Sequence, residues 1–317
     1  MTVKEKILSE LEGAEEKCIS GQALAQKLGV SRQAVWKAIK SLQEDGYIIE
    51  ASPNNGYTLQ KIGDFLSAER VRELLPPSLQ SLEIQVFDVL DSTNTFAKKL
   101  AADGAEKDTL IIARRQTAGR GRRGHSFYSP DKDGLYMSLM LKPRKNFVDI
   151  SLYTICAANA VCDAIESLCG KSPQIKWVND IFLDRKKICG ILTEATVNME
   201  SGFIDSVIIG VGINISTTDF PDEIAQIAGS LGGSTTRSRL AAAITERLYT
   251  ELSLPSQEII SRYRQRSLVI GKEVSFIRND ESFAAVATGI ADNGELEVLL
   301  KNGERLLLNS GEISVKL

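Results

Sequence analysis

The sequence predicts an α+β protein in three parts: a small helical unit that ends in a hairpin (residues 1–62), a central domain of mixed strands and helices (residues 83–268) and a small β domain (residues 269–317). Residues 63–82 form the expected linker. Three observations support this division. Apolar residues recur at helical spacing in the first part. In the central domain, strand-like and helical runs follow one another without regular alternation. In the last part, short β-prone runs lie between turns of Asn, Asp and Gly.

The first part reads as a helix-turn-helix followed by a hairpin. After a glycine turn, Ser31 is a suitable N-cap for a second helix that runs to about residue 43. Its apolar face consists of Val35, Ile39 and Leu42, spaced i, i+4 and i+7. Two β-prone runs around a Pro/Asn/Gly turn follow within residues 47–59 and predict the hairpin.

The polar side of that second helix predicts DNA binding. Residues 17–43 contain five basic residues and no acid. The side chains expected on the outer face are of types that contact base edges and phosphates in a major groove: Ser31, Arg32, Gln33, Lys37 and Lys40. The hairpin would then be a wing. A small helical domain for protein contacts is the alternative. Trp36 could face either the core or DNA, and we expect the core.

The later elements predict a mixed sheet and a small β domain. Central strands are expected over residues 82–89, 110–114, 135–141, 174–178, 188–194 and 203–215, and helices over 94–102, 150–169, 237–252 and 257–266. One short helix, stopped by Pro76-Pro77, is expected in the linker. The last part shows β-prone runs over 274–277, 284–290, 295–300 and 305–309, which predict a small barrel or sandwich.

An arginine-rich glycine loop follows the apolar strand at residues 110–113. Residues 116–124 read Gln-Thr-Ala-Gly-Arg-Gly-Arg-Arg-Gly and match GxGxxG by letter. A dinucleotide fold needs a helix directly after the loop, and none is expected here, so that interpretation is rejected. No GxxxxGK[ST] occurs. The glycines permit close approach to a ligand, and the arginines can bind phosphate. A plain basic surface loop is the alternative.

Three further clusters lie beside expected strands. Ser92, Thr93 and Asn94 precede a helix, where such side chains either cap the helix or bind a ligand. Lys176 and Asp180 form either an ordinary ion pair or a site for phosphate and metal. In the third cluster, Gly210, Gly212 and Asn214 alternate with the apolar residues of the strand at 207–214. This nearly bare strand face suggests that something else fills the space above it.

Composition limits the remaining possibilities. The net charge is −3, and the chain has five cysteines, an odd number without a CxxC pair, which predicts buried free thiols. The single histidine, His125, argues against a His-ligated zinc site. No run is read as long and apolar enough to span a bilayer, and residues 1–6 lack a signal-peptide pattern. We therefore expect a cytoplasmic protein without a membrane partner.

Taken together, the motifs resemble those of the biotin–protein ligases of the bifunctional ligase and repressor type. The resemblance covers essentially the whole chain, and its specificity comes from the order and spacing of six motifs. These are DSTN (91–94), QTAGRGRRG (116–124), KWVND (176–180), KxxGIL (187–192), GVGIN (210–214) and GEIS (311–314).

The resemblance implies a winged helix-turn-helix, a central ligase domain of the class II aminoacyl-tRNA synthetase and biotin ligase kind, and a C-terminal SH3-like β-barrel. It implies that biotin and ATP, with Mg²⁺, give biotinyl-5′-AMP, and that biotin then passes to a lysine of a carrier domain, as in a biotin–[acetyl-CoA-carboxylase] ligase. It also implies repression of biotin genes with biotinyl-5′-AMP as corepressor, operator DNA as a partner and a ligand-dependent homodimer. A lipoate-type ligase and a ligand-sensing repressor without ligase activity are the alternatives.

The resemblance also assigns site residues. The residues implied to bind biotin or biotinyl-AMP are Ser92, Thr93, Asn94, Gln116, Gly119, Arg120, Gly121, Arg122, Lys187, Gly190, Gly210, Gly212 and Asn214. The implied catalytic cations are Lys187, Arg120, Arg122 and Lys176, and Asp180 is the expected magnesium ligand. Such cations would offset the repulsion between a carboxylate and the α-phosphate it attacks.

Overall fold

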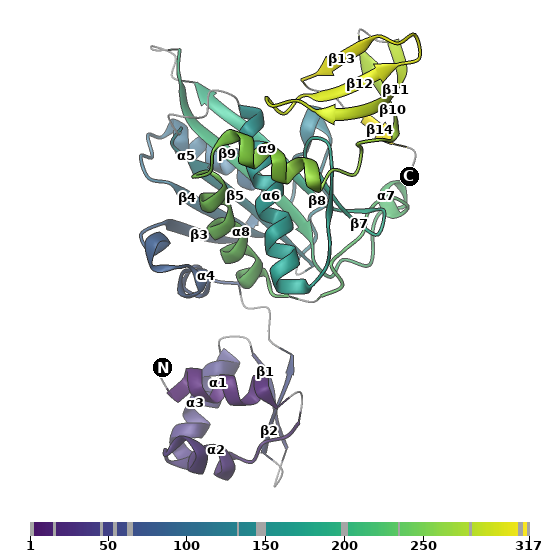
Figure 1. The fold of residues 1–317 in the computed structure, drawn as a ribbon. Helices are drawn as coiled ribbons and strands as arrows, with labels where there is room; N and C mark the ends of the chain where they lie inside the picture. The colour runs from purple at the N-terminus through teal and green to yellow at the C-terminus, as the bar shows by residue number, and fades with distance from the viewer. Residues whose placement is uncertain are drawn as a thin grey trace. The chain divides into compact units, whose positions relative to one another are not determined.

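The computed structural model describes residues 3–14, 17–44, 47–52, 56–61, 66–131, 133–143, 150–197, 202–233, 235–278, 281–309 and 313–315. It divides into two compact units, residues 1–66 and 67–317, and each is described by itself. Figure 1 shows the elements of both units.

The smaller unit is a helix-turn-helix with a two-stranded sheet. Its elements are α1 (Val3–Gly13), α2 (Gly21–Leu28), α3 (Arg32–Glu44), β1 (Ile48–Ser52) and β2 (Gly56–Lys61). Ser20 caps α2, and Gly29 ends it with a left-handed φ of 65°. The Ser31 Oγ accepts a hydrogen bond from the Ala34 N–H (3.1 Å), so the expected N-cap of the second helix is present.

One expectation for this unit is wrong. Val35, Ile39 and Leu42 are buried as predicted, but Trp36 is 53% exposed. Its ring instead lies under the Lys40 ammonium, with Nζ 5.5 Å from the ring centroid. The apolar stripe of α3 already fills its side of the core, so the indole lies on the outer face.

The larger unit is built on a seven-stranded mixed sheet of order β3-β4-β5-β9-β8-β7-β6. The strands are β3 (Glu83–Leu90), β4 (Thr109–Gln116), β5 (Gly134–Leu141), β6 (Gln174–Lys176), β7 (Asp180–Leu183), β8 (Lys186–Val197) and β9 (Ile204–Asn214). Only β3 and β4 pair in parallel, and the other neighbours are antiparallel. The predicted mixed sheet is therefore confirmed.

Helices cover both faces of this sheet. The helices of the larger unit are α4 (Ala68–Leu74), α5 (Thr93–Ala102), α6 (Ile150–Cys169), α7 (Asp222–Ala225), α8 (Arg237–Glu251) and α9 (Ser256–Gln265). In Figure 1, α6, α8 and α9 lie in front of the sheet. On the other face Ala97 and Ala101 of α5 pack with Ile111, Met140 and Ile208 of the strands. The α5 face also holds the cavity described below.

Helix α6 meets the length and hydropathy requirements for a membrane span, which the sequence analysis considered unmet. It is the one helix in the described part of the chain that does so. However, 67% of its most apolar window is buried inside the fold. A core helix of a globular domain has these properties, and α6 is packed between the sheet and α8.

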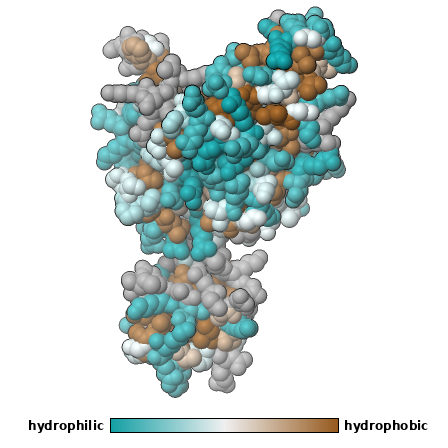
Figure 2. Space-filling view, in the orientation of Figure 1, coloured by the Kyte–Doolittle hydropathy of each residue, from teal (hydrophilic) through white to brown (hydrophobic). Residues whose placement is uncertain are grey.

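The last part of the chain is a five-stranded antiparallel sheet of order β13-β12-β11-β10-β14. Its strands are β10 (Glu273–Arg278), β11 (Glu281–Ile290), β12 (Leu296–Leu300), β13 (Arg305–Leu308) and β14 (Ile313–Val315). The small β domain is confirmed. Hydrophobic side chains are visible over its strands in Figure 2, and Ile277, Val286 and Leu307 are among the exposed ones.

Polar contacts join this sheet to the larger domain near the KWVND segment. The Trp177 Nε1–H donates to the Gly294 carbonyl (3.0 Å), and the Arg264 guanidinium binds the Ile290 carbonyl (2.6 Å) and Asp292 (2.7 Å). The C-terminal β14 therefore comes to lie beside the cavity, where Ile313 is part of its wall.

Candidate functional site

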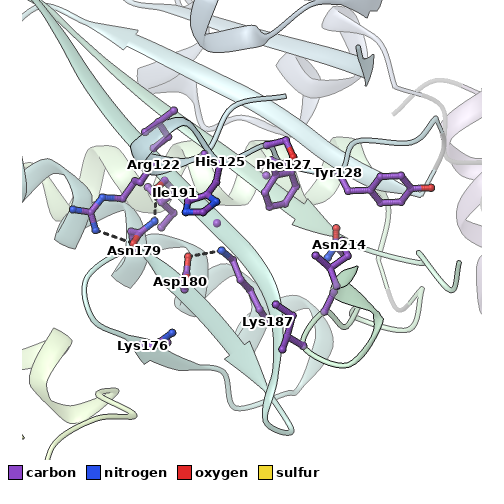
Figure 3. Close-up of a pocket in the computed structure, with 18 of the residues that line it drawn as sticks. Arg122, His125, Phe127, Tyr128, Lys176, Asn179, Asp180, Lys187, Ile191 and Asn214 are labelled. Carbon is purple, nitrogen blue, oxygen red and sulfur yellow. Dashed lines mark hydrogen bonds and ion pairs between the residues drawn. The ribbon is translucent and has the colours of Figure 1, made fainter. Parts of the chain in front are cut away.

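A cavity of about 880 Å³ opens on the α5 face of the large sheet. Its volume is in the range of pockets that hold cofactors and drug-sized ligands. Its walls come from the start of α5, the arginine-rich loop, the hairpin β7–β8, the middle of β9, residues 220–228 and β14. Segments far apart in sequence therefore converge on one site, and Figure 3 labels ten of its residues.

Asn94 is held in one orientation at the inner end of this cavity. Its Nδ2 donates to the Leu192 carbonyl (3.1 Å) and to Glu194 (2.9 Å), while its Oδ1 accepts from Ser138 (2.6 Å). A side chain with this many partners cannot rotate freely. Ser92 acts as a helix cap, one of the two roles that the sequence left open, because its Oγ accepts a hydrogen bond from the Thr95 N–H and caps α5.

Thr93 and Gln116 meet on the same wall. The Gln116 Oε1 accepts from the Thr93 N–H (2.8 Å) and lies 3.2 Å from the Thr93 hydroxyl oxygen, and its Nε2 donates to Ser129 (3.0 Å). Ser138, fully buried on β5, contacts the Thr93 hydroxyl at 2.7 Å. These contacts fix the polar end of the cavity before any ligand contact is made.

The strand face that looked bare in sequence is occupied by this chain's own side chains. A Cβ added to Gly210 would overlap Asn94, and one added to Gly212 would lie 2.6 Å from the Phe127 ring. The same ring lies 3.2 Å from a Cβ position at Gly190. The glycines are thus required by close packing. The expectation that something else fills the space above this strand face is confirmed, and the occupants are Phe127 and Asn94 of this chain.

The arginine-rich loop leaves β4 and folds back through a hydrogen bond from the Phe127 N–H to the Gly119 carbonyl (2.9 Å). The described residues between the loop and β5, 125–131 and 133, form no α-helix, as expected. Arg122 reaches across the cavity, where Nη1 donates to the Asn179 Oδ1 (3.2 Å), as Figure 3 shows. Asn179 is in turn fixed by its Nδ2, which donates to the Ile191 carbonyl (2.9 Å).

Arg120 points toward an acid that the sequence analysis did not single out. Its Nη2 lies 3.7 Å from Glu194 Oε1, and Lys98 Nζ lies 2.9 Å from the same oxygen. Burial alone would raise the pKa of Glu194, but hydrogen bonds from Lys98 and Asn94 and the charges of Lys98 and Arg120 hold that pKa below its ordinary value. Glu194 is thus an ionised centre that links α5, β8 and the loop.

Lys187 and Asp180 form an ion pair in the cavity wall. The Lys187 Nζ lies 2.7 Å from Asp180 Oδ1, and both side chains are largely shielded from solvent. The two residues come from neighbouring antiparallel strands, β7 and β8. Lys176 lines the same wall, with its ammonium 5.9 Å from the centroid of the Phe182 ring.

A segment before α8 is fixed beside Lys187. The Lys187 N–H donates to the Ile227 carbonyl (2.8 Å), and the Gly229 N–H donates to the Lys187 carbonyl (2.9 Å). Asn214 Nδ2 also donates to the Gly229 carbonyl (2.9 Å). Asn214 therefore holds a wall of the cavity in place, and Tyr128 and Phe220 pair as tilted rings (centroids 6.4 Å) on the same side.

The charge of the wall favours anions. Among the described lining residues six are Lys or Arg and one is an acid: Arg120, Arg122, Lys176, Arg185, Lys186 and Lys187 against Asp180. No group of three or more His, Cys, Asp or Glu that could hold a metal is found in the described residues. One carboxylate beside several cations fits a Mg²⁺ that arrives with phosphate groups, and does not fit a protein-only metal cage.

Most of the predicted ligand residues meet in this cavity. Those that line it are Ser92, Thr93, Asn94, Gln116, Arg120, Gly121, Arg122, Lys176, Asp180, Lys187, Gly190, Gly210, Gly212 and Asn214. Gly119 does not line it and lies within the loop, where an added Cβ would overlap the Phe127 carbonyl oxygen. Sequence reasoning missed Ser138, Asn179, Glu194 and Phe127. Asn179 had a local signal because it lies inside the KWVND motif, and Phe127 had one because it lies three residues after the arginine-rich loop.

The second predicted site is the outer face of α3 in the smaller unit. Ser31, Arg32, Gln33, Lys37 and Lys40 are all exposed there. Among the described side chains no acid forms an ion pair with Arg32, Lys37 or Lys40. By contrast Lys27 on α2 pairs with Glu10. The exposure of these α3 cations makes them accessible to an anionic partner.

Comparison with known proteins finds matches for both units of the chain. Residues 86–214 match the model of the biotin/lipoate A/B protein ligase family, residues 3–58 match an HTH domain, and residues 269–316 match the biotin protein ligase C-terminal domain. The bifunctional ligase/repressor BirA of Bacillus subtilis is 40% identical over 232 residues, which are 73% of this chain and 71% of the relative. BirA of Escherichia coli is 28% identical over 305 residues, 94% and 92% of the two chains.

A solved structure has the same fold over the larger part of the chain. The biotin protein ligase from Aquifex aeolicus in complex with biotin and ATP superposes with a TM-score of 0.63 at 26% identity. The match covers 74% of this chain and 98% of that one.

Proposed function

This chain belongs to the biotin/lipoate A/B protein ligase family. Because the relatives named above are bifunctional ligase/repressors, we infer that it is a biotin–protein ligase that also represses transcription. It forms biotinyl-5′-AMP from biotin and ATP and transfers biotin to a lysine of a biotin carrier protein. The observation that carries this conclusion is the single cavity in which a fixed polar end, around Asn94, adjoins a wall of six cations.

The first reaction joins two anions. A carboxylate oxygen of biotin attacks the α-phosphorus of ATP, the bond to the β-phosphate oxygen breaks, and pyrophosphate leaves. We propose that Lys187, Arg120 and Arg122 offset the repulsion and stabilise the charge that develops on phosphorus. The 2.7 Å contact of Lys187 with Asp180 supports this role, because the paired acid holds the ammonium in the wall.

The polar end of the cavity suits the ring system of biotin. Biotin's ureido group offers two N–H donors and one carbonyl acceptor, and such a group needs few, well-placed partners. We propose that Thr93, Asn94 and Gln116 supply them, with Ser92 holding the helix start. Support comes from their mutual hydrogen bonds, which orient them in advance. Gly190, Gly210 and Gly212 contribute backbone to the same wall.

We propose that Asp180 is the protein ligand of a magnesium ion carried by ATP, with Lys176 beside the phosphates. The lone carboxylate in a basic wall supports this assignment. When bound, Mg²⁺ neutralises phosphate charge and orients the leaving group. In the second reaction the amine of the carrier lysine attacks the acyl carbon, the acyl–oxygen bond to AMP breaks, and AMP leaves with its electron pair.

The smaller unit binds operator DNA through α3. We further propose that biotinyl-5′-AMP is the corepressor, and that ligand binding favours a homodimer, since two helix-turn-helix units on one duplex read paired half-sites. We also propose a cytoplasmic location. All five cysteines are free thiols, and burial raises the pKa of Cys156, Cys162 and Cys189.

The ligase is tested with the full chain, ATP, Mg²⁺ and labelled biotin. An acid-labile adenylate is expected, and the label should move to a single lysine when a biotin carrier domain is added. Lipoic acid in place of biotin should give far less adenylate. A folded protein that forms no adenylate would overturn the enzyme assignment, and preference for lipoate would replace it with a lipoate ligase.

The switch is tested by sedimentation with and without biotin and ATP, with operator DNA as a second titrant. A shift from monomer to dimer that accompanies tighter DNA binding is expected. Dimers without ligand would contradict ligand control of dimerisation. Adenylate formation without any sequence-specific DNA binding would remove the repressor assignment and leave the ligase assignment.

A further inference from the structure

The outer face of α3 carries an aromatic residue that the proposed function does not yet use. Trp36 is 53% exposed in the middle of the helix, while its neighbours Val35 and Ile39 are buried. Tryptophan is highly buried on average in folded proteins. An indole that stays half exposed on a rigid helix is therefore available for contact with a partner.

The surroundings of this indole are cationic. Arg32, Trp36 and Lys40 follow one another at i, i+4 and i+8, so they lie on one side of the helix about 6 Å apart along its axis. The Lys40 Nζ lies 5.5 Å from the centroid of the Trp36 ring. This cation–π contact restricts the indole and keeps it on the helix surface. Lys37 adds a third cation beside it.

This arrangement fits DNA better than an apolar protein groove. Cations on both sides of the indole match the two phosphate strands that border a major groove. An apolar partner would have to bury those cations without counter-charges, which is costly. Between the phosphate strands, the major-groove edges of the base pairs offer one apolar group, the C5-methyl of thymine.

We propose that Trp36 is a specificity-determining residue that reads thymine through its C5-methyl group, with Arg32 and Lys40 on the flanking phosphates. The inference rests on the proposed DNA-binding function and adds to it the kind of base that is recognised. It also separates two roles on one helix: the cations supply affinity for any sequence, and the indole supplies preference among sequences.

The test begins with selection of duplexes from a random pool by the full chain with biotin, ATP and Mg²⁺. The best duplex is then prepared with thymine and with deoxyuridine, which differs only by the missing methyl. Wild-type protein should bind the deoxyuridine duplex about fourfold more weakly for each methyl contacted, the factor that corresponds to one buried methyl-sized group. Trp36→Ala should bind the thymine duplex more weakly and show a ratio near one.

Two control variants make the result specific. Ile48→Ala removes another side chain that is 53% exposed, at the start of β1, and should keep the wild-type thymine-to-deoxyuridine ratio. Lys40→Ala should reduce the slope of log affinity against log salt by about one, whereas Trp36→Ala should leave the slope unchanged. Adenylate formation by Trp36→Ala should equal that of wild type.

The outcomes are distinguishable. Equal binding of both duplexes by wild type, or an unchanged ratio in Trp36→Ala, would overturn the thymine assignment while the repressor assignment stands. If no sequence is enriched from the pool, the DNA-binding function itself fails and this inference fails with it. If Trp36→Ala reduced the slope of log affinity against log salt, the indole would act by positioning the cations. That result would also refute the proposal.

Discussion

Lys187 Nζ lies 2.7 Å from Oδ1 of Asp180, so the lysine assigned to the reacting carboxylate and phosphate is already part of an ion pair. The pair joins β7 to β8, and its two members have different proposed roles. Asp180 both positions the ammonium and offers the lone carboxylate of the cavity wall to a metal ion.

Asp180→Asn tests these two roles together. We expect adenylate formation to fall by about tenfold to a hundredfold, the usual cost of losing a supporting partner. The Mg²⁺ concentration for half-maximal rate should rise, which ATP–pyrophosphate exchange measures directly. Asp184→Asn, an exposed substitution in the adjacent turn whose φ of 47° asparagine tolerates, is the control. A reduced rate with unchanged Mg²⁺ dependence would leave Asp180 as a positioning residue only.

Gly210→Ala tests the packing at the inner end of the cavity. The new Cβ would overlap the Asn94 amide and displace it from Ser138 and Leu192. We expect a loss of about 1–3 kcal/mol in the free energy of unfolding from overpacking, together with weaker biotin binding by calorimetry. In the double variant Asn94→Ala/Gly210→Ala the overlap is gone, so the unfolding cost should be less than the sum of the two single costs. Strict additivity would contradict the clash.

Arg122→Gly tests the cation that crosses the cavity to Asn179. We expect the adenylate to dissociate about tenfold to a hundredfold faster, as for the loss of one hydrogen bond to a charged group. Release of labelled adenylate during gel filtration or by a chase measures the rate. Arg123→Gly is the matched control, because Arg123 is exposed, does not line the cavity and already has a φ of 53° that suits glycine. Equal release rates for the two variants would remove Arg122 from the site.

Glu194→Gln tests the partly buried acid beside Arg120. The pKa of Glu194 is lowered in the folded protein, so its ionised form stabilises the fold fully above the ordinary carboxyl pKa of 4.5. That stability is lost as pH falls through the lowered folded-state value. The difference in urea midpoint between wild type and Glu194→Gln, followed by circular dichroism, should be constant from pH 7 to about 5 and shrink below it. A difference that grows toward low pH would contradict the direction of the shift.

The sequence predicts most elements because their signals are local. The Ser31 cap, the apolar stripe of α3 and the runs that become β4, β5, α6 and β9 each carry periodicity or capping within one segment. Strands β7 and β14 were not predicted, since they have four and three residues and form only against a neighbouring strand. Trp36 was misplaced because it lies about 100° around the helix from Val35, at the edge of the apolar stripe, where spacing alone does not decide between core and surface.

The site was predictable in its motifs and not in its supports. Arg120, Lys187 and Asn94 belong to motifs with recognisable order. Glu194 and Ser138 become significant only because they contact Asn94, which lies 100 and 44 residues away from them in sequence. The glycine-rich face of β9 was read correctly as a close approach. Its occupant could not be named, because the packing of Phe127 over Gly212 depends on how the arginine-rich loop folds back.

The chain's two tryptophans are divided between the two units. Trp36 is half exposed on α3, and Trp177 is 3% exposed, with its indole N–H bonded to the C-terminal sheet next to the cavity. The protein thus carries two intrinsic fluorophores in opposite environments, one exposed on the helix face proposed to bind DNA and one buried beside the cavity. We expect the exposed indole to emit at the longer wavelength. A Trp36→Phe chain would report events at the ligase alone, so intrinsic emission can follow ligand and operator separately without an added dye.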